Sequence, residues 1–158
     1  IINNNSILII FFYLLLFIFL SIMEDIRYAI ICVDDEPLIL QMLGFQLEKI
    51  INPDTTLVEC FEDPVDAFEN FNEIIEEGIE IKAVIVDYQM PKLNGSGLTR
   101  KIKSKYPDIP VIMVSGQANS SDVDQLQEDK MLDAFIPKPW DEDELFEVLT
   151  PHLKSLIS

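Results

Sequence analysis

The chain has few basic residues, and this shortage narrows what the protein can do. Its 158 residues include 11 Lys or Arg against 28 Asp or Glu, which gives a net charge of −17. A surface this acidic repels a phosphate backbone, so direct binding of nucleic acid is not expected. The length fits one domain, and an apolar fraction of 49% is ample for a core.

Cysteine is also scarce, with one residue at position 32 and one at position 60. Each falls inside a predicted strand. Two buried free thiols are the usual arrangement in a cytosolic protein, and nothing else in the chain calls for the oxidising compartment that a disulfide needs. We therefore expect Cys32 and Cys60 to be free and buried.

The first 22 residues carry no charge, unlike the rest of the chain. As a helix, segment 7–22 would reach about 24 Å, short of a hydrocarbon core of about 30 Å. It lacks the basic flank and small-residue cleavage pattern of a signal peptide. The chain does not begin with Met, whereas Met23 stands just before the first strand. Translated upstream sequence, a membrane anchor and a signal peptide all stay open, and we expect residues 1–22 to lie outside a domain of residues 23–158.

Beyond Met23, apolar runs alternate with segments that carry helix signals. Five runs are typical of strands: residues 28–33, 55–61, 83–86, 111–114 and 134–136. The segments between them combine helical spacing of apolar residues with N-terminal capping residues. Five strands alternating with five helices predict an α/β fold with a doubly wound parallel sheet and right-handed crossovers.

Several helix boundaries can be predicted from single residues. The first crossover helix should begin at Pro37 and carry one apolar face as far as Ile50. Asp63 should cap the second helix, and Gly78 should end it. Pro151 should break or kink the last helix, because proline lacks the amide hydrogen that a helix interior uses.

Polar residues follow four of the five strands. They are Asp34, Asp35, Asp87, Ser115 and Lys138. In open parallel sheets, ligands bind beyond the carboxyl ends of the strands, so these side chains should converge on one small site. Three carboxylates, a hydroxyl and an ammonium suit a divalent cation and a phosphoryl group.

With these motifs the chain resembles the receiver domain of bacterial two-component response regulators, and in particular a stand-alone, chemotaxis-regulator-like receiver. The resemblance covers about residues 25–153. It is carried by VDDEP at 33–37, VDYQMPKLNG at 86–95, VSG at 114–116 and FIPKP at 135–139. Each motif alone is weak, but four in this order, each at a strand end, are specific. The resemblance implies a flavodoxin-like, five-stranded sheet with strand order 2-1-3-4-5.

The resemblance also implies roles for the acidic residues. Asp87 would be the phosphoacceptor, whose carboxylate attacks phosphorus to form an acyl phosphate. Asp35 and Asp87 would ligate Mg²⁺ directly, with the main-chain carbonyl of Gln89 as a third ligand. Asp34 would act on the metal mainly through water. Clustered carboxylates repel one another, which predicts at least one raised pKa in the metal-free state.

The remaining site residues also receive roles from the resemblance. Lys138 would pair with Asp87 before phosphoryl transfer and with the phosphoryl group afterwards. The hydroxyl of Ser115 would donate a hydrogen bond to that group. Phe135 stands where the family keeps an aromatic switch residue, and a plain core phenylalanine is the other interpretation. The bond between Lys138 and Pro139 is expected to be cis.

The function implied by the resemblance is a cytoplasmic, phosphorylation-dependent signalling switch rather than an enzyme. A sensor histidine kinase or a histidine phosphotransfer protein would be the phosphodonor, and a downstream protein would read the change. Gln89 and Gln117 favour slow self-dephosphorylation, since an amide cannot take a proton from water. Two alternatives stay open: a haloacid-dehalogenase-like phosphatase with an aspartyl nucleophile, and a receiver fragment of a larger regulator or hybrid kinase. Membrane association would arise only through residues 1–22.

Overall fold

The protein is built around a five-stranded parallel sheet. The computed structural model describes residues 4–23, 26–116, 121–154 and 156. The strands are β1 (Tyr28–Val33), β2 (Thr56–Phe61), β3 (Glu80–Asp87), β4 (Val111–Ser115) and β5 (Ala134–Pro137). Their order in the sheet is β2-β1-β3-β4-β5, and all neighbours are parallel. The predicted flavodoxin-like α/β fold is therefore confirmed.

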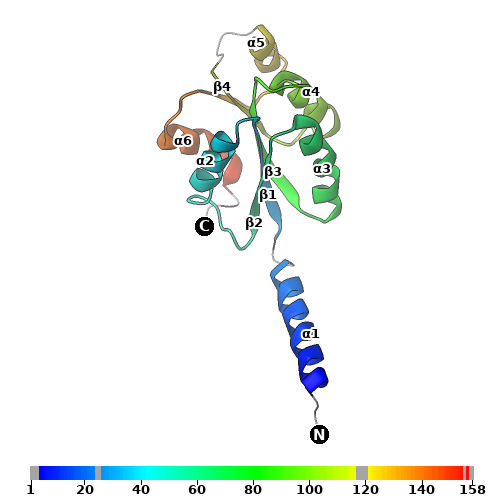
Figure 1. Ribbon diagram of the computed structural model, residues 1–158. Helices are drawn as coiled ribbons and strands as arrows, with labels where there is room; N and C mark the ends of the chain where they lie inside the picture. Colours follow the sequence, from blue (N-terminus) through cyan, green and yellow to red (C-terminus); the bar gives the residue numbers. More distant parts are fainter. Residues whose placement is uncertain (1–3, 24–25, 117–120, 155, 157–158) are drawn as a thin grey trace.

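Helices cover both faces of this sheet. They are α1 (Asn4–Met23), α2 (Pro37–Leu47), α3 (Pro64–Glu76), α4 (Gly95–Lys105), α5 (Ser121–Glu128) and α6 (Glu142–Leu153). Helices α2 and α6 lie on one side of the sheet, while α3 and α4 lie on the other, with α5 beside α4 (Figure 1). Among the described residues, five of the six helices are the predicted ones, and α1 is an additional helix upstream of the sheet.

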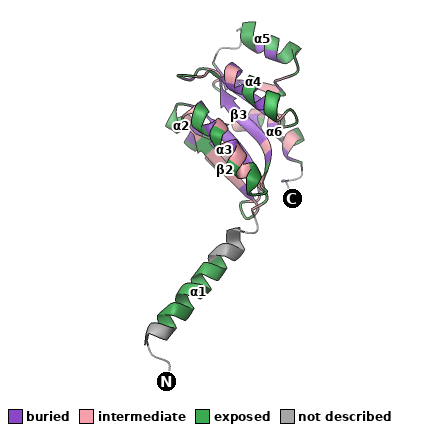
Figure 2. Ribbon diagram, turned by 90° about the vertical axis from the view of Figure 1, so that its right-hand side faces the viewer, coloured by how far each residue is buried: buried purple, intermediate pink, exposed green. Residues whose placement is uncertain are grey.

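Each face of the sheet has its own apolar core. Successive residues of a strand point to opposite faces, so β1 sends Ile30 and Cys32 toward α2 and α6, and Ile31 and Val33 toward α3 and α4. All four side chains are almost fully buried, as is most of β3 at the centre of the sheet (Figure 2). Burying one large aliphatic side chain stabilises the fold by about 1.5–3 kcal/mol. The two cores therefore fix the strand ends that carry the polar residues.

The predicted helix caps are largely confirmed. The side chain of Asp63 accepts a hydrogen bond of 2.8 Å from the amide of Val65 at the start of α3. Gly78 follows the end of α3 with a φ of +82°, a conformation that glycine adopts without a steric penalty. The sequence alone thus locates both ends of this helix.

Two helix boundaries differ from the predictions. Helix α2 ends at Leu47, because the amides of Lys49 and Ile50 bond carbonyls only three residues back. Ile50 therefore lies beyond the helix, although it still packs against the core. Pro151 does not end α6, which continues to Leu153. Leu153 is fully buried against the sheet, and this packing offsets the one backbone hydrogen bond that proline removes.

The two cysteines are free, as predicted, but only one of them is buried. Cys32 lies in β1, inside the sheet, and is inaccessible. Cys60 is exposed, which corrects the prediction, because β2 is an edge strand with no neighbour on its outer side. Apolar sequence in an edge strand does not by itself guarantee burial.

Helix α1 stands apart from the sheet (Figures 1 and 2). Its large apolar side chains from Ile7 to Ile18 are 40–71% exposed. In the described part of the chain, no helix meets the combined length and hydropathy that crossing a bilayer requires. That residues 23–158 form an independent domain stays a prediction.

Candidate functional site

The register of the sheet brings the predicted polar residues to one edge. Three register pairs fix their positions: Val33 with Val86, Asp87 with Val114, and Ser115 with Pro137. Asp34 follows Val33 directly and therefore lies beside Asp87. The amide of Lys138 donates a hydrogen bond of 2.9 Å to the carbonyl of Ser115, which ties the end of β5 to the end of β4.

Lys138 is the centre of this edge. Its Nζ lies 2.8 Å from Oδ2 of Asp34 and 2.9 Å from Oδ1 of Asp87. The two carboxylates are 2% and 5% exposed, respectively. Glu36 lies farther out, with its Oε1 3.6 Å from the same ammonium. A single cation therefore lies between two buried carboxylates and offsets their mutual repulsion.

The pKa values of Asp34 and Lys138 are set by burial and by the hydrogen bonds of the Lys138 ammonium. Burial raises the pKa of Asp34, and the charge of Asp87 adds to the rise. Hydrogen bonds from Lys138 and from the amide of Glu36 oppose this shift without cancelling it. The predicted raised pKa is thus confirmed, with burial rather than repulsion as its main cause. Burial disfavours the charged form of Lys138, but its hydrogen bonds to Asp34 and Asp87 prevail and raise the pKa of this lysine.

Two of the predicted metal ligands lie at the rim of this cluster. Asp35 is exposed, and no hydrogen bond or ion pair to its carboxylate occurs within the described residues. Gln89 is exposed in the loop after β3. Within the described segments, no group of three or more Asp, Glu, His or Cys side chains is gathered as a ready metal site. The oxygen donors nevertheless suit Mg²⁺, which retains several waters and needs only one or two carboxylates.

The remaining predicted residues lie along β4 and β5. Ser115 is buried at the end of β4. Phe135 is half-buried, pairs in register with Met113 and packs against the core on the α3 and α4 side. The bond between Lys138 and Pro139 is cis, as expected. Gln117 lies outside the described residues.

Two contributors to the site were not predicted. Glu36 is the third carboxylate near Lys138, and its amide donates a hydrogen bond of 2.9 Å to Oδ1 of Asp34. At Gly95, an added Cβ would lie 2.2 Å from the carbonyl oxygen of Asp87. Only glycine allows α4 to start this close to the end of β3. The sequence signal for Gly95 is its place after Asn94, whose side chain caps α4.

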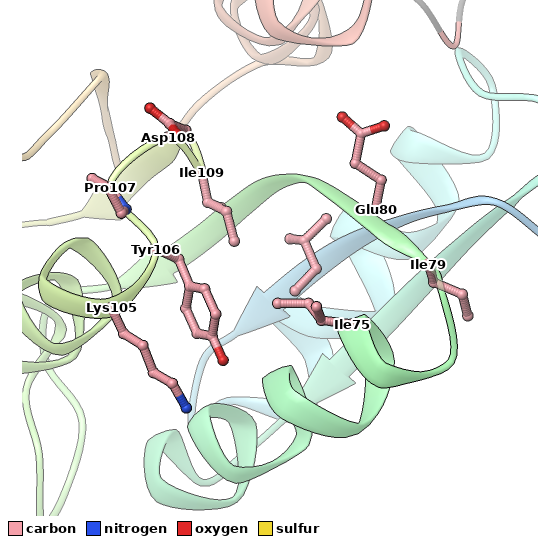
Figure 3. Close-up of a pocket in the computed structure, with 9 residues that line it drawn as sticks. Ile75, Ile79, Glu80, Lys105, Tyr106, Pro107, Asp108 and Ile109 are labelled. Carbon is pink, nitrogen blue, oxygen red and sulfur yellow. The ribbon is translucent and has the colours of Figure 1, made fainter.

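A separate cavity lies at the opposite end of the sheet. It measures about 390 Å³ and lies between the end of α3, the start of β3 and the segment that precedes β4 (Figure 3). Tyr106 and Ile75 face it from two sides. Because Asp87 and Ser115 stand at the carboxyl ends of the same strands, this cavity does not belong to the acid–lysine cluster.

The sequence matches the family described as response regulator receiver domain over residues 30–150. Since this match covers more than half of the chain, the protein belongs to that family. Phosphorylation in two-component signalling is characteristic of the family.

Individual relatives agree with this assignment. The sensor kinase CckA of Brucella abortus is 39% identical over 69 residues, which are 43% of this chain and 7% of that protein. A response regulator receiver domain protein from Clostridium thermocellum is 28% identical, with a TM-score of 0.65 and coverage of 81% of this chain and 95% of that one. The CheX–CheY complex of Borrelia burgdorferi, solved with BeF₃ and Mg²⁺, shares the fold at 20% identity, a TM-score of 0.66 and coverage of 80% and 89%. The chain spans less than half of the length of the curated relatives it matches.

Proposed function

We propose that this protein is a phosphorylation-dependent signalling switch that accepts a phosphoryl group on Asp87. The observation that carries the proposal is the placement of Lys138, 2.9 Å from Asp87 and 2.8 Å from Asp34 at the carboxyl ends of three strands. An ammonium that already holds two carboxylates can exchange one of them for a phosphoryl oxygen without leaving its place. A lysine that served only stability would not need a site at the ligand-binding edge of the sheet.

The transfer step follows from these positions. A carboxylate oxygen of Asp87 attacks phosphorus, and the bond from phosphorus to the donor nitrogen breaks. The imidazole that leaves takes up a proton, and an acyl phosphate remains on Asp87. Lys138 then pairs with a phosphoryl oxygen, and the hydroxyl of Ser115 donates a hydrogen bond to another.

A divalent cation completes the proposed site. Asp35 and Asp87 would hold Mg²⁺ together with the carbonyl of Gln89, while Asp34 would orient a bound water. When bound, the cation supplies positive charge to the phosphoryl oxygens as they approach the carboxylates. The CheX–CheY structure, with BeF₃ and Mg²⁺ on a protein of the same fold, supports this part of the proposal.

The proposed phosphodonor is a sensor histidine kinase or a histidine phosphotransfer protein, and the proposed readout is a downstream protein. Beyond assisting its own phosphorylation and dephosphorylation, the module would have no enzymatic activity, and we place it in the cytoplasm. The match to part of CckA supports a second possibility, that the chain acts as the receiver of a larger regulator or hybrid kinase. A phosphatase of the haloacid-dehalogenase-like group would use a second aspartate two residues after the nucleophile. Gln89 stands at that position, which counts against this alternative.

Phosphoramidate tests the donor chemistry, because its phosphorus–nitrogen bond is the kind that breaks in phosphohistidine. The protein is incubated with phosphoramidate and either Mg²⁺ or EDTA, and the phosphorylated fraction is measured on a phosphate-affinity gel. We expect a retarded band only with Mg²⁺, and loss of that band after mild alkali, which hydrolyses an acyl phosphate. A band that survives alkali would place the phosphate on a hydroxyl, an imidazole or an amine rather than on a carboxylate, and it would contradict the proposal.

A further inference from the structure

The two cysteines of the chain are direct neighbours across two strands. Cys32 in β1 and Cys60 in β2 are register partners in a parallel pair, so their side chains leave the sheet on the same face. Adjacent strands lie about 4.8 Å apart, within the range of about 4.4–6.8 Å that Cα atoms span across a disulfide. Each thiol shifts the pKa of the other. Little backbone movement would therefore be needed to join them.

The two thiols differ in access. Cys32 is fully buried, whereas Cys60 is exposed. Cys60 lines a cavity of about 290 Å³ between α2 and β2, together with Phe45 and Val58. Its Sγ lies 3.9 Å from the carbonyl oxygen of Leu40. A small solute can therefore reach Cys60 from solvent, while Cys32 has no surface open to solvent.

The two thiols also differ in pKa. The neighbouring Cys32 lowers the pKa of Cys60, although burial and the charge of Glu59 act in the opposite direction, while burial and Cys60 raise the pKa of Cys32. A thiolate rather than a thiol is the nucleophile toward peroxides and disulfides. The accessible cysteine is thus the one that more readily supplies a thiolate, with a protonated thiol beside it.

We propose that Cys60 and Cys32 form a reversible oxidation site for small hydroperoxides, with Cys60 as the attacking thiol and Cys32 as the resolving thiol. The sulfur of Cys60 attacks one peroxide oxygen, the oxygen–oxygen bond breaks, and Cys60 becomes a sulfenic acid while hydroxide or alkoxide leaves. The sulfur of Cys32 then attacks that of Cys60, and water leaves with the proton of Cys32. Two electrons pass from the two thiols to the peroxide, and a disulfide joins β1 to β2. This proposal does not depend on phosphorylation of Asp87.

Intact mass of the full chain tests the proposal cleanly, because the protein has no third cysteine. After brief exposure to hydrogen peroxide, the monomer should lose about 2 Da, and a dithiol should restore the mass. The number of thiols that iodoacetamide labels in denaturant should fall from two to none. Two results would overturn the proposal. One is that iodoacetamide still labels two thiols under conditions that oxidise the five methionines. The other is a disulfide-linked dimer on a non-reducing gel.

Two variants separate the roles of the cysteines. Cys32→Ala should stop at the sulfenic acid, which dimedone traps on Cys60 in a peptide map. Cys60→Ser should leave Cys32 unoxidised, because the buried thiol lacks access. If Cys32 in the Cys60→Ser variant is oxidised as fast as the unaltered chain loses its thiols, the proposed order of attack is contradicted. If the Cys32 variant fails to fold, the unaltered protein can test the order of attack. Iodoacetamide should label Cys60 before Cys32. Labelling of Cys32 first would overturn the proposed order.

Discussion

The ammonium of Lys138 lies 2.9 Å from Oδ1 of Asp87, although Asp87 ends β3 and Lys138 follows β5, two strands that are not neighbours in the sheet. Strand β4 separates β3 from β5, so the lysine side chain reaches across the end of β4. Ser115 is the last residue of that intervening strand. The carboxylate of Asp87, the hydroxyl of Ser115 and the ammonium of Lys138 thus lie at the ends of three adjacent strands. In the proposed function, all three contact the phosphoryl group.

Lys138→Ala should lower the free energy of unfolding measured with urea in the absence of divalent cations. The variant leaves Asp34 and Asp87 buried without a counterion, and breaking such a pair costs on the order of 3 kcal/mol. Mg²⁺ should recover part of the loss, because it binds the folded state.

Lys49→Ala is the matched control, since it removes the same charge from an exposed pair with Glu142. The free energy of unfolding of this control should fall by less than about 1 kcal/mol. A loss in Lys138→Ala no larger than that of the control would show that Lys138 does not neutralise the carboxylates.

Asp35→Ala should weaken Mg²⁺ binding at least about tenfold, and more than Asp34→Ala does, because Asp35 is the proposed direct ligand. Titration followed by the fluorescence of Trp140 can measure this, and calorimetry serves if that ring does not respond. Asp54→Ala removes an exposed acid away from the strand ends and should leave the affinity unchanged. Equal affinity in Asp35→Ala and the unaltered protein would exclude Asp35 as a ligand.

The raised pKa of Asp34 predicts a pH dependence of stability. In the absence of metal, the folded state holds this proton more tightly than the unfolded chain does. The contribution of Asp34 is therefore most favourable below its unfolded pKa of about 3.9 and declines as pH rises through the raised folded value. The unfolding free energy of the unaltered protein minus that of Asp34→Asn should fall as pH rises above about 4. A difference that rises with pH would show that pairing with Lys138 outweighs burial.

The sequence is sufficient to predict the sheet and most of the site. Alternation of strands and helices predicts a doubly wound parallel sheet, and the family resemblance implies its strand order. Polar residues at strand ends place Asp34, Asp87, Ser115 and Lys138 at one edge. The reason is geometric, since the carboxyl ends of parallel strands must meet. The ion pairs of Lys138 with both buried carboxylates were not specified by spacing, because a lysine stem can reach many positions.

Features that depend on tertiary contacts were harder to predict. The close approach of Gly95 to the carbonyl of Asp87 results from how α4 docks on the sheet. Exposure of Cys60 depends on which strand lies at the edge. The continuation of α6 past Pro151 depends on burial of Leu153. At Gly95 and Pro151 a contact with a remote segment overrides the local pattern, and at Cys60 the edge position of β2 does.

A shortened chain that starts at Met23 should remain folded and reactive. The described site is assembled from Asp34 onward, and the large side chains of α1 from Ile7 to Ile18 are exposed. We expect one cooperative urea transition and the same fraction of phosphorylated protein as in the full chain. If the shortened chain fails to fold while the full chain folds, residues 1–22 belong to the domain.

Intact mass after incubation with acetyl phosphate and Mg²⁺ tests the central claim most directly. The unaltered protein should gain one phosphoryl group, about 80 Da, because Asp87 is the proposed nucleophile. Asp87→Asn should gain none, and Asp66→Asn, which alters an acid in the first turn of α3, should gain the same mass as the unaltered protein. Full labelling of Asp87→Asn would contradict the account, since the phosphoryl group would then reside on another residue.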